Sequence, residues 1–174
     1  MAMWKWLGFG ADARAPSAEF DSLTEIEKAL VGLDRTRARY AACFSYILTR
    51  SARADHQVSD AETSEMERLV AKNTGLSGDQ AATAVRLAAA QARRSGGTDD
   101  FVITREFDRL ATHQQKIALV DCLFAVSSVD ASIVTIEDNE IRRIANELKI
   151  EHPEYIAVRS RHLDNLEVLR RGGR

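Results

Sequence analysis

The sequence predicts an all-α protein: a single helical bundle of about seven to eight helices with an internal pseudo-repeat of helix-loop-helix units. Three observations lead to this prediction. The chain has only 2 prolines in 174 residues, and its apolar residues recur at helical spacing. Ser or Thr stands repeatedly three residues before Glu or Gln, which is the capping pattern that opens helices. A hydrophobic share of 45% is ample for one buried core.

The first four helices are predicted from their start and stop signals. In chain order they cover about 22–31, 35–53, 60–73 and 77–95, and they begin at Ser22, Asp34, Ser59 and Ser77. Gly32 and Gly75 are suited to ending the first and third helices, and Gly96 with Gly97 to ending the fourth. The second helix is long and amphipathic, so we expect it at the centre of the bundle. The fourth is rich in alanine, which favours helix and permits close helix approach.

The later helices follow from similar signals. We expect an amphipathic helix over 99–110 with apolar members Phe101, Ile103, Phe107 and Leu110. The next helix is capped at Thr112 and is the counterpart of the long second helix. Two more are expected over about 136–149 and, with Pro153 in its first turn, from there to about residue 169. The predicted organisation is therefore a flexible segment 1–20, a helical domain 21–169 and a disordered basic tail 170–174.

One stretch of the chain occurs twice. Asp55 and Glu62 match Asp130 and Glu137 at a constant offset, since 130 − 55 = 75 and 137 − 62 = 75. The same offset pairs Glu65 with Glu140, Arg68 with Arg143, Val58 with Ile133, Met66 with Ile141, and Leu69 with Ile144. Acidic and core-facing positions thus repeat in one register, as expected of a duplicated helix-loop-helix unit.

The four repeated acids are the candidate site: Asp55, Glu62, Asp130 and Glu137 as metal ligands. Clustered carboxylate oxygens favour hard cations such as Ca²⁺ or Mg²⁺. The pattern is not an EF-hand, because Met66 occupies the position of the bidentate carboxylate. A site would therefore have to recruit ligands across the two copies.

Helix capping is the alternative role for these acids. Glu62 can be the reciprocal partner of Ser59 in a capping box, and Asp55 can stabilise its own turn. In the second copy Val134 stands where Ser59 stands in the first, yet Glu137 is kept. Capping alone thus accounts for Glu62 better than for Glu137, although Thr135 with Asp138 offers a shifted cap.

Charge and cysteine content narrow the function classes. The chain has 24 basic and 26 acidic residues, and its formal charge of −2 argues against a nucleic-acid partner. Cys43 and Cys122 lie far apart in apolar runs, so we expect reduced core residues of a cytoplasmic protein. No segment approaches the roughly 20 apolar residues of a membrane span. Trp4, Trp6 and Phe9 suggest a peripheral contact with the inner membrane as an alternative to docking on the domain itself.

The repeated segments and the pieces between them resemble a known family. The paired Ala-Asp…Val…Glu and Val-Asp…Ile…Glu segments, the alanine-rich helix, residues 107–119 and residues 140–148 are similar to the tellurite-resistance TerB-like family, especially its stand-alone bacterial members. The resemblance covers about residues 38–165. It implies an all-helical bundle with internal pseudo-symmetry and an acidic surface for divalent cations. It also implies links to metal-oxyanion resistance, stress responses and membrane-associated or phage-defence assemblies.

The sequence therefore predicts a non-catalytic binding or adaptor domain whose acidic loops bind a divalent cation or a basic protein partner. It contains no zinc-protease, phosphate-loop or nucleophile-turn motif. The arginines of the long helix, with Arg53 and Arg68, are expected to line a positive face. The alternatives are a membrane-recruited scaffold that uses the N-terminal tryptophans and, less favoured, a metal-dependent accessory enzyme. No oligomeric state is predicted.

Overall fold

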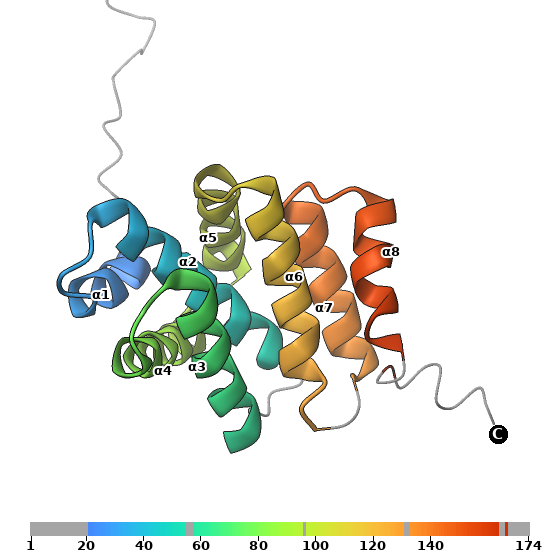
Figure 1. Ribbon diagram of the computed structural model, residues 1–174, viewed down its shortest axis with the longest axis horizontal. Coiled ribbons are helices and arrows are strands. Elements are labelled where there is room, and N and C mark those ends of the chain that lie inside the picture. Colours follow the sequence, from blue (N-terminus) through green and yellow to red (C-terminus); the bar gives the residue numbers. More distant parts are fainter. Residues whose placement is uncertain (1–20, 55–57, 96, 131–132, 164–165, 167–174) are drawn as a thin grey trace, which may run out of the picture.

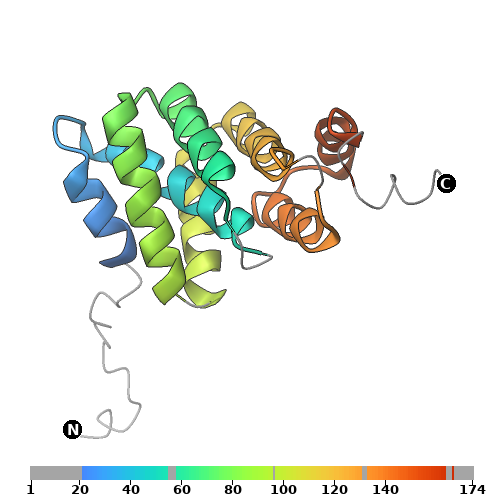
Figure 2. The same cartoon turned by 90° about the horizontal axis from the view of Figure 1, so that it is seen from below.

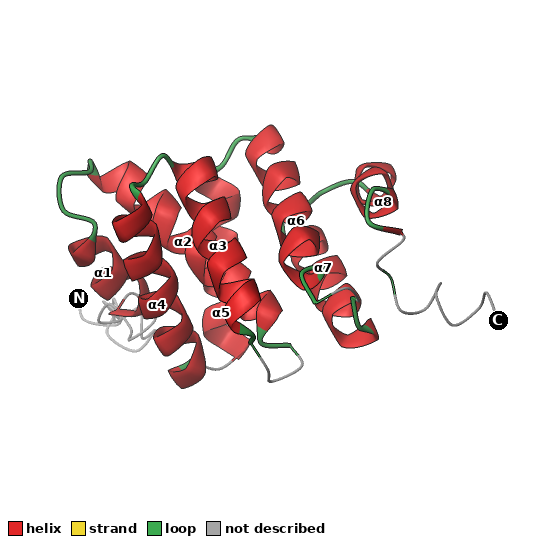
Figure 3. Cartoon of the chain, turned by 60° about the horizontal axis from the view of Figure 1, so that its bottom comes forward, coloured by secondary structure: helices red, strands yellow, loops and turns green. Residues whose placement is uncertain are grey.

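The protein is built from α-helices alone in the part of the chain that the structure describes. The computed structural model describes residues 21–54, 58–95, 97–130, 133–163 and 166, and Figure 3 shows helices and loops there without a strand. The helices are α1 (Asp21–Ala29), α2 (Arg35–Ala52), α3 (Asp60–Thr74), α4 (Gly78–Arg94), α5 (Gly97–Leu110), α6 (His113–Ser127), α7 (Thr135–Glu147) and α8 (His152–Ser160). The all-α prediction with about seven to eight helices is confirmed.

Most helices begin at the residue that the capping signals predicted. Asp34 caps α2 by accepting a hydrogen bond from the backbone N–H of Arg37 at 3.0 Å. Reciprocal capping boxes open α3, α4 and α6 at Ser59, Ser77 and Thr112. Gly75 ends α3 in the left-handed conformation, with φ of 71°, where a side chain would be strained. These helix ends depend on residues only three or four positions apart, so the local sequence suffices to predict them.

Several helix boundaries differ from the prediction: α1, for example, begins at Asp21, so Ser22 lies inside it. Helix α8 ends at Ser160 instead of residue 169, because Leu166 lies beside Ile133 in a parallel β-bridge that a continued helix could not form. Gly97 begins α5 instead of ending α4, which stops at Arg94. Phe101 is exposed, unlike Ile103, since two residues along a helix turn the side chain about 200° around the axis.

Helix α2 lies at the centre of the bundle, as predicted. It packs against α1, α3, α4, α5, α6 and α7, with α1 and α8 near opposite ends of the molecule (Figure 1). Most of its residues beyond Ala38 are buried, among them Phe44 and Tyr46. Cys43 and Cys122 are also buried, and burial raises the pKa of the Cys122 thiol to about 12. Both thiols are therefore neutral core groups.

The sequence repeat is visible as two helical hairpins. Helices α2 and α6 end at equivalent positions, since 52 + 75 = 127, and α3 and α7 begin at equivalent positions, since 60 + 75 = 135. The hairpins contact each other reciprocally, α2 with α6 and α7, and α6 with α2 and α3. Helix α4 then packs on the first hairpin and α8 on the second (Figure 2). We call α2–α4 the first unit and α6–α8 the second unit.

Candidate functional site

The two repeated glutamates occupy the same position in their units. Glu62 and Glu137 lie in the first turns of α3 and α7, with only 6% and 4% of their surface exposed. Glu62 accepts a hydrogen bond from the Ser59 backbone N–H at 2.8 Å, and Glu137 accepts one from Val134 at 3.1 Å. Val134 offers no hydroxyl in return. Both carboxylates therefore cap their helices, and the second does so without a side-chain partner at the cap position.

The shifted cap considered for the second copy does not form. Asp138 instead accepts hydrogen bonds from the Arg159 guanidinium, at 3.0 and 2.7 Å, and from the Tyr155 hydroxyl at 3.3 Å. This carboxylate thus joins α7 to α8, and burial together with that negative charge raises the pKa of Tyr155 to about 12.

The remaining two acids belong to the loops. Asp130 is exposed after the end of α6, and Asp55 lies outside the described residues. Within the described ranges, no three His, Cys, Asp or Glu side chains come together as ligands for a metal ion. The cation site built on Asp55, Glu62, Asp130 and Glu137 therefore stays a prediction.

A buried arginine is the main feature that sequence reasoning missed. The Arg50 side chain donates hydrogen bonds to Glu140 at 2.7 Å, to Glu147 at 2.9 Å and to Thr104 at 2.8 Å, and so ties α2 to α5 and α7. Desolvation opposes its charge, yet these carboxylates outweigh it and raise the pKa of Arg50. One signal was present in the sequence: Glu140 and Glu147 are seven residues apart, so they share one face of a helix with a buried isoleucine.

The arginines that were expected to form a positive face along the long helix have separate partners. Arg50 is buried, Arg39 forms ion pairs with Glu27 at 2.6 Å and Glu106 at 3.4 Å, and Arg68 pairs with Glu65 within α3. These three arginines therefore do not form one continuous positive face, because carboxylates of other helices approach Arg39 and Arg50, and Glu65 approaches Arg68. Arg53 differs, since it lines a surface groove.

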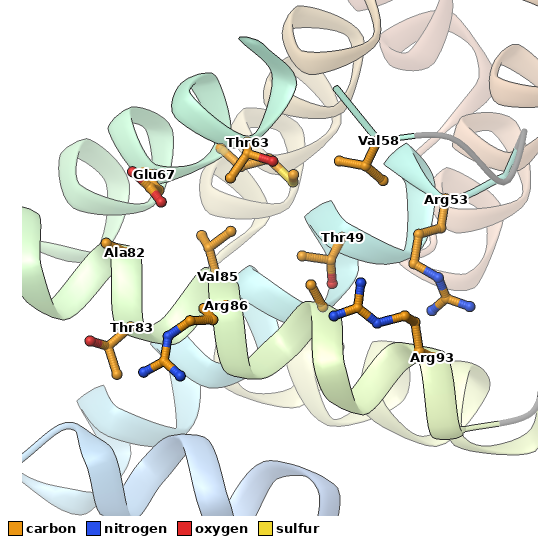
Figure 4. Close-up of a pocket in the computed structure, with 12 residues that line it drawn as sticks. Thr49, Arg53, Val58, Thr63, Glu67, Ala82, Thr83, Val85, Arg86 and Arg93 are labelled. Carbon is orange, nitrogen blue, oxygen red and sulfur yellow. The ribbon is translucent and has the colours of Figure 1, made fainter. Parts of the chain in front are cut away.

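The groove lies between the end of α2, helix α3 and helix α4 of the first unit (Figure 4). Its volume is about 660 Å³, which lies within the range typical of ligand sites. It is lined by Thr49, Arg53, Val58, Thr63, Met66, Glu67, Ala82, Thr83, Val85, Arg86, Ala89 and Arg93. We use the name groove for this set. It was not predicted, because its residues come from three segments that only the fold brings together.

The groove combines apolar walls with positive charge. Arg53 and Arg93 lie toward one end of it, and Glu67 and Arg86 lie toward the other (Figure 4). Counting these four residues gives a charge of 3 − 1 = +2, opposite in sign to the whole chain at −2. None of the three guanidinium groups forms an ion pair with a carboxylate of the described residues. The groove can therefore hold an anionic group next to an apolar one.

In the second unit, the region that corresponds to the groove is filled by side chains. Thr49 corresponds to Phe124, since 124 − 49 = 75, and the Phe124 ring stacks on His162 with ring centroids 5.3 Å apart. Val58 corresponds to Ile133, and while Val58 is 42% exposed, Ile133 is only 1% exposed. The difference arises because Leu166 lies beside Ile133 in the β-bridge.

These features define the chain as an all-α domain built from a duplicated helix-loop-helix unit. It belongs to the TerB family: the family model of Tellurite resistance protein TerB matches residues 41–160, more than half of the chain. This confirms the family resemblance of the sequence. Neither a curated protein nor a solved structure matches the chain. None of the described helices has the length and apolar character needed to cross a membrane, and Trp4, Trp6 and Phe9 lie outside the described residues.

Proposed function

We propose that this TerB-family chain is a non-catalytic binding domain that docks a protein partner in a resistance system of the tellurite type, and that the partner binds at the groove. The observation that carries the proposal is the trio of arginines beside an apolar surface, without carboxylate partners in the described part of the chain. Exposed guanidinium groups next to aliphatic side chains are typical of protein-binding surfaces. Partners with acidic surfaces would be favoured.

The composition of the groove supports binding over catalysis. Its lining contains no His, Cys, Ser or Lys, and Glu67 is its one carboxylate. A hydrolase or transferase site needs a nucleophile or activated water, a base to accept its proton, and donors for the developing negative charge. Arginines could supply the last of these, but the lining offers no paired nucleophile and base.

Partner capture with matched variants tests this proposal. The purified chain, its Arg53→Glu/Arg93→Glu variant and its Arg35→Glu variant are used as baits in extracts of the cells that produce the protein, and bound proteins are quantified by mass spectrometry. Arg35 is exposed on α2 outside the groove, so it controls for charge. We expect a partner that the wild type and the control retain and that the double variant loses at least tenfold. Equal recovery by the double variant, or no recovered partner, would overturn the proposal.

Cation binding by the acidic loops is the second candidate function. The observation that favours it is that a carboxylate is kept at the same buried position in both units, although only Ser59 supplies a hydroxyl cap. Calorimetric titration with Ca²⁺, Mg²⁺ and Mn²⁺ tests it. We expect heat that the Asp55→Ala/Asp130→Ala variant abolishes; absence of heat, or heat that this variant leaves unchanged, would reject it.

A further inference from the structure

We infer that the groove binds an extended, acidic segment of a partner protein, with an aliphatic side chain of that segment seated against Val58. This inference rests on the proposed function and names the chemistry of the docked partner. Its basis is the positive charge of the groove, together with a related contact in the second unit, where Leu166 pairs with Ile133.

In the second unit the residue before the helix cap is covered by Leu166. Leu166, which follows α8, lies beside Ile133 in a parallel β-bridge, and both residues are 1% exposed. Ile133 immediately precedes Val134, the N-cap of α7. The residue one position before the helix cap therefore offers an aliphatic side chain, and a backbone that can pair with a residue from another part of the chain.

The first unit keeps the matching position, Val58, but no described residue pairs with it as Leu166 pairs with Ile133. Val58 stands one position before Ser59, the N-cap of α3, and that cap has the same extended backbone as Val134: φ and ψ are −78° and 161° at Ser59, and −77° and 157° at Val134. The position that matches Leu166 is Gln91, since 166 − 75 = 91, and it lies inside α4. Because α4 continues as a helix there, the described chain offers no extended segment to Val58, and the Val58 backbone forms no hydrogen bond to another described residue.

The positive charge of the groove favours a partner segment that carries acidic residues. In the second unit the position that matches Thr63 is Asp138, which is paired with Arg159 at 2.7 Å. In the first unit Arg53, Arg86 and Arg93 remain available to a ligand. The sequence around Leu166 is Asp-Asn-Leu-Glu, an aliphatic residue between acids. Single-stranded nucleic acid is a poorer fit, because the groove lining contains no aromatic residue on which bases could stack.

A peptide based on that sequence provides the test. The fluorescently labelled peptide Glu-Asp-Asn-Leu-Glu-Asp, blocked at both ends, is titrated with the full chain and followed by anisotropy. We expect saturable binding that weakens with added salt. Replacing leucine by serine in the peptide, or its acids by amides, should weaken binding at least tenfold. In a ¹⁵N-labelled sample the amide signal of Val58 should shift during the titration.

Matched variants of the protein complete the test. Arg53→Glu/Arg93→Glu and Val58→Asp should each weaken binding at least tenfold, while Arg35→Glu should change it less than twofold. All these positions are at least partly exposed, and circular dichroism checks that each variant is folded. Undetectable binding, equal affinity for the amide peptide, or full affinity in the double variant would overturn the inference.

Two further outcomes separate this inference from the proposed function. If the peptide fails to bind while partner capture still depends on Arg53 and Arg93, the proposed function stands and the extended acidic segment is wrong. If sedimentation shows a dimer that the double variant dissociates, a second copy occupies the groove and the inference is overturned.

Discussion

The first and second units share one backbone plan and differ in what fills the region beside the repeated loop. Both keep the buried capping glutamate, and both keep an ion pair one turn further along, Glu65 with Arg68 at 2.7 Å and Glu140 with Arg143 at 2.9 Å. The second unit closes its loop region with stacked rings and a covering leucine, whereas the first leaves a charged groove. The two units are thus alike where capping and core packing fix the residues, and they differ in the region beside the loop, where neither applies.

The largest expected effect concerns the contact that joins the two units. Arg50→Met should lower the free energy of unfolding by about 3–5 kcal/mol, because it leaves partly buried carboxylates without their cation. The change is measured by urea denaturation. The exposed control Arg35→Met should change it by less than about 0.5 kcal/mol, and a loss below about 1 kcal/mol for Arg50→Met would show that water replaces the guanidinium.

The next prediction tests the difference between the open and the filled loop region directly. Ile133→Ala should cost about 2–4 kcal/mol, as expected for a fully buried aliphatic side chain. Val58→Ala at the matching position should cost less than about 1 kcal/mol, because Val58 is substantially exposed. Both are compared by thermal and urea unfolding. Equal costs would mean that Val58 is also covered in solution.

An acid-sensitive contact joins α5 to the second unit. Asp108 accepts hydrogen bonds from Lys116 of α6 and from Lys149, which follows α7. Burial raises the pKa of Asp108, but the two lysines outweigh burial, so its pKa is lowered overall. A lowered folded-state pKa means that this stabilisation is present at neutral pH and is lost as pH falls through that pKa.

Asp108→Asn should therefore cost about 1–2 kcal/mol at pH 7, and the difference from wild type should shrink below about pH 4. Urea unfolding across this pH range measures it. Glu25→Gln, at an exposed position of α1, serves as the control with little effect at either pH. A cost that is independent of pH would indicate a packing defect instead of a lost charge.

The smallest expected effects concern the helix caps. Ser59→Ala should destabilise the protein by about 1 kcal/mol, because it removes the hydroxyl that accepts the Glu62 N–H. Val134→Thr should stabilise it by about 0.5 kcal/mol by adding that acceptor in the second unit. Thermal unfolding midpoints should move in opposite directions. Two shifts of the same sign would contradict the equivalence of the caps.

The sequence correctly predicted those features of the structure that depend on residues close together in the chain. Asp34, Ser77 and Gly75 marked helix ends correctly because capping involves residues only a few positions apart. The repeat placed Glu62 and Glu137 in equivalent positions for the same reason. The metal site built on all four acids stays a prediction, since Asp55 lies outside the described residues.

Features that depend on distant residues were not predictable in the same way. Arg50 was expected on a positive face, and its burial could not be predicted because its partner Glu147 lies 97 positions away. The end of α8 was misplaced because the apolar spacing after Ser160 also suits a helix, and only the contact of Leu166 with Ile133 decides against it. The groove could not be found without knowing how α2, α3 and α4 pack.

The contact made by Arg50 has no counterpart in the second unit, although the two units share one backbone plan. The matching position of α6 holds Ala125, since 125 − 50 = 75, so no second arginine reaches back toward α3. A symmetric pair of identical single units would have carried the same residue at both positions. Within a single chain that requirement is absent, so Arg50 and Ala125 can differ, and the two units are not interchangeable at this contact.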